Sequence, residues 1–136
     1  MVKIIPSKRE DIKKLSKDLW DEFGKESEHE LDVQDLAFVI EENNKNIGIF
    51  TIKIVSGVAI LEEMVIKSEY RNKKTGYNVM EYFEKLAKEH NCHKLRIKTC
   101  PEVMPVAFHL YKKLRYIEEA VLKNDYFNKD WVILKK

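Results

Sequence analysis

The hydrophobic pattern of this chain changes its period at Lys67, and that change limits the fold more than any other feature of the sequence. Before Lys67 there are three β-prone segments separated by turns, over residues 36–42, 47–55 and 58–67. After it, apolar residues recur at helical spacing in two segments, 76–90 and 103–114, with a short strand-like run at 94–99 between them. A meander of three strands followed by helix, strand and helix predicts a mixed α/β domain.

The start of the chain predicts one strand and one helix. Val2–Ile5 is a short β-prone run that Pro6 ends. Ser7 and Glu10 then match a capping box, in which each side chain accepts a hydrogen bond from a free backbone N–H of the first helical turn. We therefore expect a helix over residues 8–22, with Gly24 at its end.

The remaining segments complete the expected order of elements. Residues 25–35 are acidic and weakly patterned, and form either a short second helix or a loop. Two strands close the chain, over residues 116–123 and 126–134. The predicted order is β-α-(α)-β-β-β-α-β-α-β-β, with a mixed central sheet of six to seven strands and helices on both of its faces.

Length and charge exclude several classes of protein. The 136 residues, 44% of them hydrophobic, suffice for one core and predict a single domain over 1–136. Because 25 Lys and Arg nearly balance 23 Asp and Glu, the net charge of +2 does not favour nucleic acid or an anionic membrane as partner. No apolar run approaches the roughly 18–20 residues of a membrane span, and no signal peptide is visible. Two cysteines then indicate free thiols in a reducing, cytoplasmic setting.

A basic loop between a strand and a helix is the strongest sign of a binding site. Arg71, Lys73 and Lys74 lie where the strand ending at Lys67 gives way to the helix beginning near Gly76. Free N–H groups at a helix start, its partial positive charge and nearby cations together favour a phosphate. The alternative is that these cations form an ordinary solvated turn.

Two motifs, taken with the order of the elements, resemble the GNAT superfamily of N-acetyltransferases over the whole chain. Residues 66–71 and 71–76 are similar to the family patterns Val-x-Pro-x-Tyr-Arg and Arg/Gln-x-x-Gly-x-Gly/Ala. Ala107, Tyr111 and Tyr116 fall in a second pattern, Ala-x-x-x-Tyr-x-x-x-Gly-Phe. The resemblance implies transfer of an acetyl group from acetyl-CoA, as co-substrate, to an amine.

The resemblance also implies roles for individual residues. Tyr111 would be the acid next to the CoA sulfur, although a tyrosine on the inward face of a helix is also an ordinary core residue. Main-chain groups of three strand residues would hold the acetyl group and the pantetheine arm, namely Met64, Val65 and Ile66. The pyrophosphate would be bound by the loop and the helix start, namely Arg71, Asn72, Lys73, Lys74, Thr75, Gly76 and Tyr77.

Three positions depart from the family pattern. Lys74 replaces the first glycine of the loop, Arg115 replaces the glycine before Tyr116, and Met104 lies where the family often has an asparagine. These departures support a second hypothesis, in which the chain is a weak or inactive GNAT-fold module that binds CoA or a protein partner.

Adjacent carboxylates at Glu62 and Glu63 are unusual in a central strand, because charged groups are costly to bury. The segment from Leu61 to Arg71 looks most like the corresponding strand of di- and polyamine acetyltransferases. In that interpretation one of the two is the base, with a pKa raised by its surroundings; the resemblance favours Glu62 for this role, with Glu63 helping to hold a cationic substrate, and the sequence leaves the choice between them open. The alternative is that both side chains reach a strand end or pair with Lys or Arg.

The acceptor remains open at the level of the sequence. A small amine, a polyamine-like amine and a peptide amine all fit, and the expected assembly includes a homodimer through edge strands. Acidic residues in 26–35 and 118–125 hint at a cationic substrate, but they fit a solvated acidic face equally well. No metal is expected, because Cys92 and His93 are adjacent and no Cys-x-x-Cys spacing exists.

Overall fold

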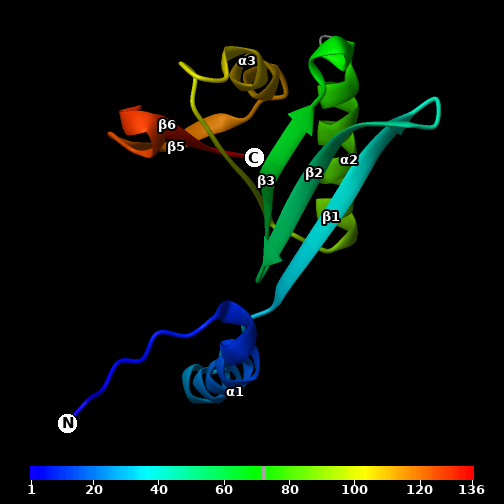
Figure 1. Cartoon of the computed structure of the whole chain (residues 1–136). Helices are drawn as coiled ribbons and strands as arrows, with labels where there is room; N and C mark the ends of the chain where they lie inside the picture. The colour runs from blue at the N-terminus through cyan, green and yellow to red at the C-terminus, as the bar shows by residue number, and fades with distance from the viewer. Residues whose placement is uncertain (72) are drawn as a thin grey trace. The chain divides into compact units, whose positions relative to one another are not determined.

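The computed structural model describes residues 1–71 and 73–136, and it divides the chain into two compact units, residues 1–32 and 33–136 (Figure 1). The predicted phosphate-loop residue Asn72 lies outside the described residues. The single domain over residues 1–136 stays a prediction.

The first unit contains one helix, α1 (Arg9–Ser27), which runs three residues beyond the predicted end at Gly24. The helix ends instead at Glu28, whose φ is 59°, and the His29 N–H donates to the Gly24 carbonyl at 3.1 Å. The N-cap residue of α1 is Lys8 rather than Ser7, and no side chain caps this end of the helix, so the predicted capping box is wrong. Val2–Ile5 is not a strand either, because a β-prone run becomes a strand only where a second strand pairs with it.

The second unit contains the sheet. Its elements in chain order are β1 (Val33–Glu42), β2 (Lys45–Val55), β3 (Val58–Ile66), α2 (Thr75–Glu89), β4 (Lys94–Thr99), α3 (Pro105–Lys113), β5 (Ile117–Leu122) and β6 (Trp131–Lys135), with short 3₁₀ turns at Ser68–Tyr70 and Tyr126–Asn128. Within the described residues the strands form one six-stranded sheet in the order β1-β2-β3-β4-β6-β5. The β3–β4 pair is parallel and the others are antiparallel, which confirms the mixed α/β fold.

One strand is shorter than predicted. We expect a strand over 126–134 from the sequence, but β6 begins only at Trp131. The preceding residues form a tight turn in which Phe127 and Asn128 have φ angles of 60° and 56°. Backbone in this left-handed region cannot continue a strand.

The core lies between one face of the sheet and the helices α2 and α3. Helix α2 runs along strands β2 and β3 (Figure 1) and buries Val79, Met80, Phe83 and Ala87. These side chains pack with apolar residues of β2, β3, β4 and β6, and with Tyr111 and Tyr116. Burial of this much apolar surface fixes the end of β3 and the start of α2 against each other.

Candidate active site

Strands β3 and β4 separate part-way along the sheet. Their pairing runs from Val58 opposite Lys94 to Leu61 opposite Ile97, and β3 then continues to Ile66 without a strand partner on that side among the described residues. Unpaired backbone N–H and C=O groups at such an edge are available to a ligand. Met64, Val65 and Ile66, predicted to hold the acetyl and pantetheine groups, all lie in this separated part of β3.

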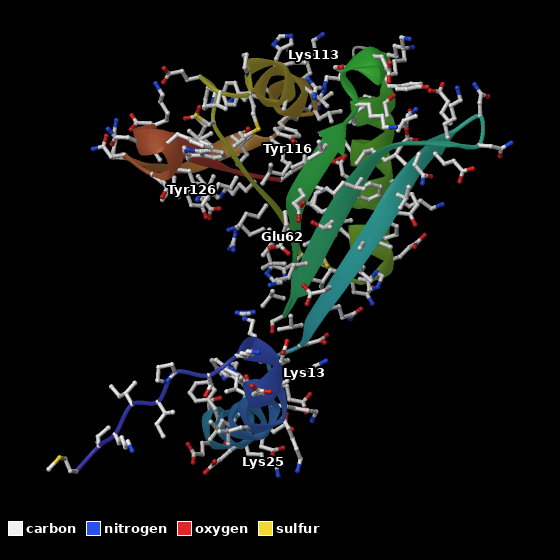
Figure 2. The ribbon with its side chains drawn as sticks, viewed as in Figure 1. Lys13, Lys25, Glu62, Lys113, Tyr116 and Tyr126 are labelled. Carbon is white, nitrogen blue, oxygen red and sulfur yellow. The ribbon has the colours of Figure 1, made fainter. Side chains whose placement is uncertain are left out.

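A β-bulge begins where the two strands separate. Leu61 lies opposite Ile52 and Glu63 lies opposite Thr51, so Glu62 is an extra residue in β3. Leu61 and Met64 consequently both face the core although they are three positions apart. The bulge leaves both carboxylates exposed rather than buried, and Figure 2 shows Glu62 beside β3. Neither carboxylate forms an ion pair with another described residue, so both are free to meet an acceptor.

Hydrogen bonds to the carbonyls of β3 and β2 hold the segment that leads into the predicted phosphate loop. The Arg71 Nε donates to the Ile66 carbonyl at 2.8 Å, and the Lys67 N–H donates to the Ile47 carbonyl at 2.8 Å. Lys73 lies 5.8 Å from the centre of the Tyr70 ring. Arg71, Lys73 and Lys74 are exposed, and within the described chain none of them has an acidic partner. The loop therefore presents uncompensated positive charge.

Helix α2 begins directly after these cations. Its N-cap residue, Lys74, has a φ of 65° and no side-chain cap, and the first turn contains no acidic residue. The backbone N–H groups of Thr75, Gly76 and Tyr77 precede the first intrahelical bond, which Asn78 donates to Lys74. Free N–H groups, a helix dipole and three cations meet here, as an anion-binding site requires.

Packing explains why residue 76 is a glycine, independently of any bound ligand. A Cβ atom on this residue would lie 3.2 Å from Leu110 Cδ2, so the missing side chain lets α2 approach α3 closely. Because Leu110 is next to Tyr111, this contact brings the start of α2 near the tyrosine that the sequence assigns as the acid.

Tyr111 is buried, with 5% of its surface exposed, and its ring lies 6.2 Å from that of Tyr116. Its side chain belongs to the same core as that of Met64, at the separated part of β3. Burial raises the pKa of Tyr111 to about 12, so the hydroxyl stays protonated at neutral pH. Within the described chain the hydroxyl donates to no protein group, which leaves it available as a donor.

The other two departures from the family pattern lie at the ends of α3. Met104 is the residue before the helix, and Pro105 occupies its first position. Arg115 follows the helix with a φ of 70°, a conformation for which glycine is the usual residue. The arginine side chain therefore imposes a steric cost that a glycine would not.

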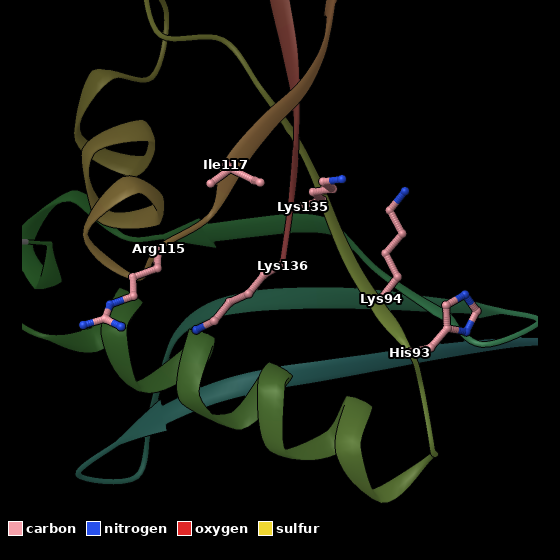
Figure 3. A pocket seen from close by; sticks show the side chains of 6 residues that line it. All are labelled: His93, Lys94, Arg115, Ile117, Lys135 and Lys136. Carbon is pink, nitrogen blue, oxygen red and sulfur yellow. The ribbon is translucent and has the colours of Figure 1, made fainter.

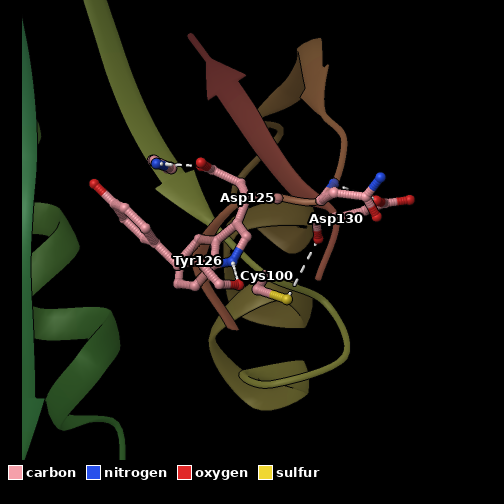
Figure 4. A network of polar contacts seen from close by, with 7 residues as sticks. Cys100, Asp125, Tyr126 and Asp130 are labelled. Carbon is pink, nitrogen blue, oxygen red and sulfur yellow. Dashed lines mark hydrogen bonds and ion pairs between the residues drawn. The ribbon is translucent and has the colours of Figure 1, made fainter. Parts of the chain in front are cut away.

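A cation–aromatic cluster near the end of β4 was not predicted. The Lys98 ammonium lies 2.6 Å from Asp125 and 3.6 Å from the centre of the Tyr126 ring, and Trp131 donates to the Tyr126 carbonyl at 2.9 Å (Figure 4). The hydrogen bond with Asp125 is the main cause of a raised Lys98 pKa. Lys98 and Asp125 are distant in sequence, so no local signal pairs them.

The histidines and cysteines do not gather in the fold. Within the described residues, no three His, Cys, Asp or Glu side chains are grouped so as to hold a metal ion. Cys92 is half-buried, and buried Cys100 donates to the Asp130 carbonyl at 3.4 Å (Figure 4). Nor does any described helix have the length and apolar character needed to cross a membrane.

A comparison with protein families decides the classification. The profile of the acetyltransferase (GNAT) family matches residues 6–116, which include the separated strand, the basic loop and Tyr111. The chain belongs to the GNAT acetyltransferase family. No curated protein sequence matches this GNAT chain significantly.

Solved structures show the same fold at low sequence identity. A protein named as an acetyltransferase from Agrobacterium tumefaciens is 18% identical, with a TM-score of 0.77 over 100% of this GNAT chain and 97% of the other. The ribosomal-protein-S18-alanine N-acetyltransferase of Escherichia coli is 19% identical, with a TM-score of 0.68 over 74% and 67%. A protein named as a streptothricin acetyltransferase from Bacillus anthracis, in complex with acetyl coenzyme A, is 16% identical, with a TM-score of 0.68 over 75% and 61%.

Proposed function

We propose that this GNAT protein is an N-acetyltransferase that moves the acetyl group of acetyl-CoA to a primary amine. The observation that carries the proposal is the arrangement of unpaired cations and free N–H groups at the start of α2, beside the unpaired edge of β3. That the similar Bacillus anthracis structure contains acetyl coenzyme A supports the choice of co-substrate. A cytoplasmic location and a homodimer stay predictions.

The cofactor would follow the edge of β3 and end at the basic loop. The pyrophosphate would accept hydrogen bonds from the first amides of α2, with Arg71, Lys73 and Lys74 supplying opposite charge. Main-chain groups of Met64, Val65 and Ile66 would hold the pantetheine arm and the acetyl group. A backbone N–H near the thioester carbonyl would also stabilise the negative charge that develops on its oxygen.

The reaction would proceed by direct attack. The neutral amine nitrogen forms a bond to the thioester carbonyl carbon, the C–S bond breaks, and the sulfur leaves as a thiolate. The nitrogen loses its proton to a base, for which Glu62 is the proposed residue, directly or through a water molecule. Glu63 would help to hold the ammonium form of the acceptor before it loses its first proton.

Tyr111 would stabilise the leaving sulfur. With a pKa of about 12 its hydroxyl is a weaker acid than an ordinary thiol, whose pKa is about 8.5. Full proton transfer to the thiolate is thus uphill while the site has this environment. The hydroxyl would therefore donate a hydrogen bond to the developing thiolate, in place of the full proton transfer that the sequence assigns to it as an acid.

Two similarities bear on the class of amine. The Escherichia coli enzyme named above acts on an alanine of a ribosomal protein, and this supports a peptide amine as one candidate. The likeness of the segment from Leu61 to Arg71 to polyamine acetyltransferases supports a small amine as another. Lys74, Met104 and Arg115 keep a weak or inactive cofactor-binding module as the alternative.

Two measurements on the purified protein test the proposal. We expect acetyl-CoA to raise the melting temperature, because a ligand bound by the native state alone stabilises it, and to be consumed when a panel of amines is added. Arg71→Ala should weaken acetyl-CoA binding, whereas Lys88→Ala, which removes an exposed cation of α2, should not. Binding without turnover on any amine would favour the alternative, and the absence of binding would reject both.

A further inference from the structure

Two of the acidic residues that hint at a cationic substrate, Glu119 and Asp125, are neutralised within the fold. Glu119 lies 2.6 Å from Lys94, and Asp125 lies 2.6 Å from Lys98. The hydrogen bond from Lys94 is the main cause of a lowered Glu119 pKa, and the charges of Lys94, Lys135 and Arg96 add to it. Three cations therefore surround one carboxylate on this part of the sheet.

Two of these cations form an unfavourable pair. Arg96 of β4 lies directly opposite Lys135 of β6, and within the described chain neither forms an ion pair. Cross-strand neighbours have Cβ atoms roughly 5 Å apart, where like charges destabilise a sheet. In Figure 3 the amino groups of Lys94 and Lys135 lie on one side of the strands, while Arg115 and Lys136 extend away from them. A shallow pocket of ≈ 380 Å³ borders Lys94 and Lys135.

This cationic cluster shares a face of the sheet with the acidic pair. Leu95, Ile97 and Leu134 belong to the core, so Arg96 and Lys135 project from the opposite face. Glu63 lies on that face too, because it is opposite Thr51, whose neighbours Phe50 and Ile52 are core residues.

The spacing of the two charge clusters can be read from the register. Arg96 is opposite Ile60 of β3, three positions before Glu63, which corresponds to about 7–10 Å along the strand. Helices α2 and α3 pack against the other face. Within residues 33–136, the face that carries both clusters is therefore the one from which a second substrate would reach the separated part of β3.

We propose that the acceptor is a primary amine that also carries a carboxylate or phosphate group, with the amine directed to Glu62 and Glu63 and the anionic group to Arg96 and Lys135, since Lys94 is already paired with Glu119. This inference rests on the proposed acetyltransferase function and specifies its substrate class. It disfavours polyamines, because a second ammonium group would face the unpaired Arg96 and Lys135. An acidic peptide with a free amino terminus and a small amino acid both satisfy the chemistry.

Matched acceptors test this charge preference. We would compare acetyl transfer to a linear diamine, to the ω-amino acid of the same chain length and to the corresponding aminoalkyl phosphate. We expect kcat/KM for the anionic acceptors to exceed that for the diamine by about ten-fold, as one additional charged hydrogen bond allows. The preferred anionic acceptor then distinguishes carboxylate from phosphate.

Substitutions in the cationic cluster test whether it causes the preference for anionic acceptors. Arg96→Gln and Lys135→Gln should each raise KM for the anionic acceptor by about ten-fold with kcat little changed, and should leave the diamine unaffected. The matched control is Lys88→Gln, which removes one exposed cation from α2 and should change neither acceptor. An equal or greater preference for the diamine, or unchanged KM in both variants, would overturn the inference.

A binding measurement separates this inference from the proposed function. In the presence of CoA, the anionic acceptor should raise the melting temperature of the wild-type protein but not of Arg96→Gln or Lys135→Gln. Binding of this kind without acetyl transfer would reject the acetyltransferase proposal while retaining the anion site. Acetyl transfer to amines without any charge preference would reject the anion site while retaining the acetyltransferase proposal.

Discussion

At the scale of single residues, Tyr111 joins the packing of the core to the chemistry of the site. Its ring packs with the apolar residues behind β3, and its hydroxyl has no protein partner among the described residues. The fully buried hydroxyls that lack a partner among the described residues include that of Tyr116 but not that of Tyr111. The Tyr111 hydroxyl is therefore not sealed inside the core, and it can donate to an acceptor atom of a bound substrate.

The substitution Tyr111→Phe tests this role. It should reduce kcat by about ten- to a hundred-fold, because it removes one charged hydrogen bond made in the transition state, and it should leave acetyl-CoA affinity nearly unchanged. Steady-state kinetics and a binding isotherm measure the two quantities. Tyr116→Phe is the control, since Tyr116 is also a buried residue and its ring lies next to that of Tyr111. Similar losses in both variants would reassign Tyr111 to packing.

At the scale of elements, the start of α2 combines a backbone cost with a charge. A non-glycine residue with a φ of 65° costs about 1 kcal/mol relative to glycine. Lys74 has this unfavourable backbone conformation, and it brings an ammonium group to the end of the helix where the free amides lie. The family pattern has glycine here, so this chain replaces conformational freedom by positive charge.

Two variants of Lys74 separate these effects. Lys74→Gly should raise the free energy of unfolding by about 1 kcal/mol, whereas Lys74→Ala should not, because alanine keeps the strained backbone. Both should weaken acetyl-CoA binding several-fold by removing a cation from the phosphate loop. Denaturant titration and calorimetry provide the two readouts. Unchanged affinity in both variants would show that Lys74 does not contact a phosphate.

The elements predicted from local patterns agree well with the structure, and those set by distant contacts do not. The helix expected over 76–90 is observed at Thr75–Glu89, and the strand expected over 94–99 at Lys94–Thr99. By contrast, the bulge at Glu62 depends on how β2 and β3 pair, and the turn at Phe127 depends on left-handed backbone that local propensity does not indicate.

The residues of the candidate site show the same difference between features set by local sequence and features set by distant contacts. The basic loop and Tyr111 could be predicted, because short motifs mark them in the sequence. The neutralisation of Glu119 and Asp125 could not, since their lysine partners lie 25 or more residues away. The acidic composition of 118–125 was therefore a poor guide to the charge that an acceptor would meet.

At the scale of the whole second unit, two buried tyrosines make stability sensitive to alkaline pH. The pKa of Tyr111 is about 12 in the folded chain and about 10 when unfolded, and burial also raises the pKa of Tyr116. Between these values the unfolded chain loses protons that the folded chain retains. Stability is thus complete below about pH 10 and falls as pH rises toward the folded pKa.

Urea unfolding at a series of alkaline pH values tests this effect. The free energy of unfolding should fall by about 1.4 kcal/mol per pH unit for each such tyrosine, and Tyr111→Phe should make the decline less steep by that amount. Tyr77→Phe, a change on the exposed face of α2, serves as the control. An identical slope in Tyr111→Phe and the wild-type protein would contradict the prediction.

The short parallel pairing of β3 and β4 also has a mechanical consequence. Ten residue pairs join β1 to β2 and eight join β2 to β3, but only four join β3 to β4 and four join β4 to β6. Strand β4 is thus held by short pairings on both of its sides, whereas β3 is paired along its length with β2. A substrate bound where β3 and β4 separate would contact both strands, so occupancy of the site would also reinforce the short connection between them.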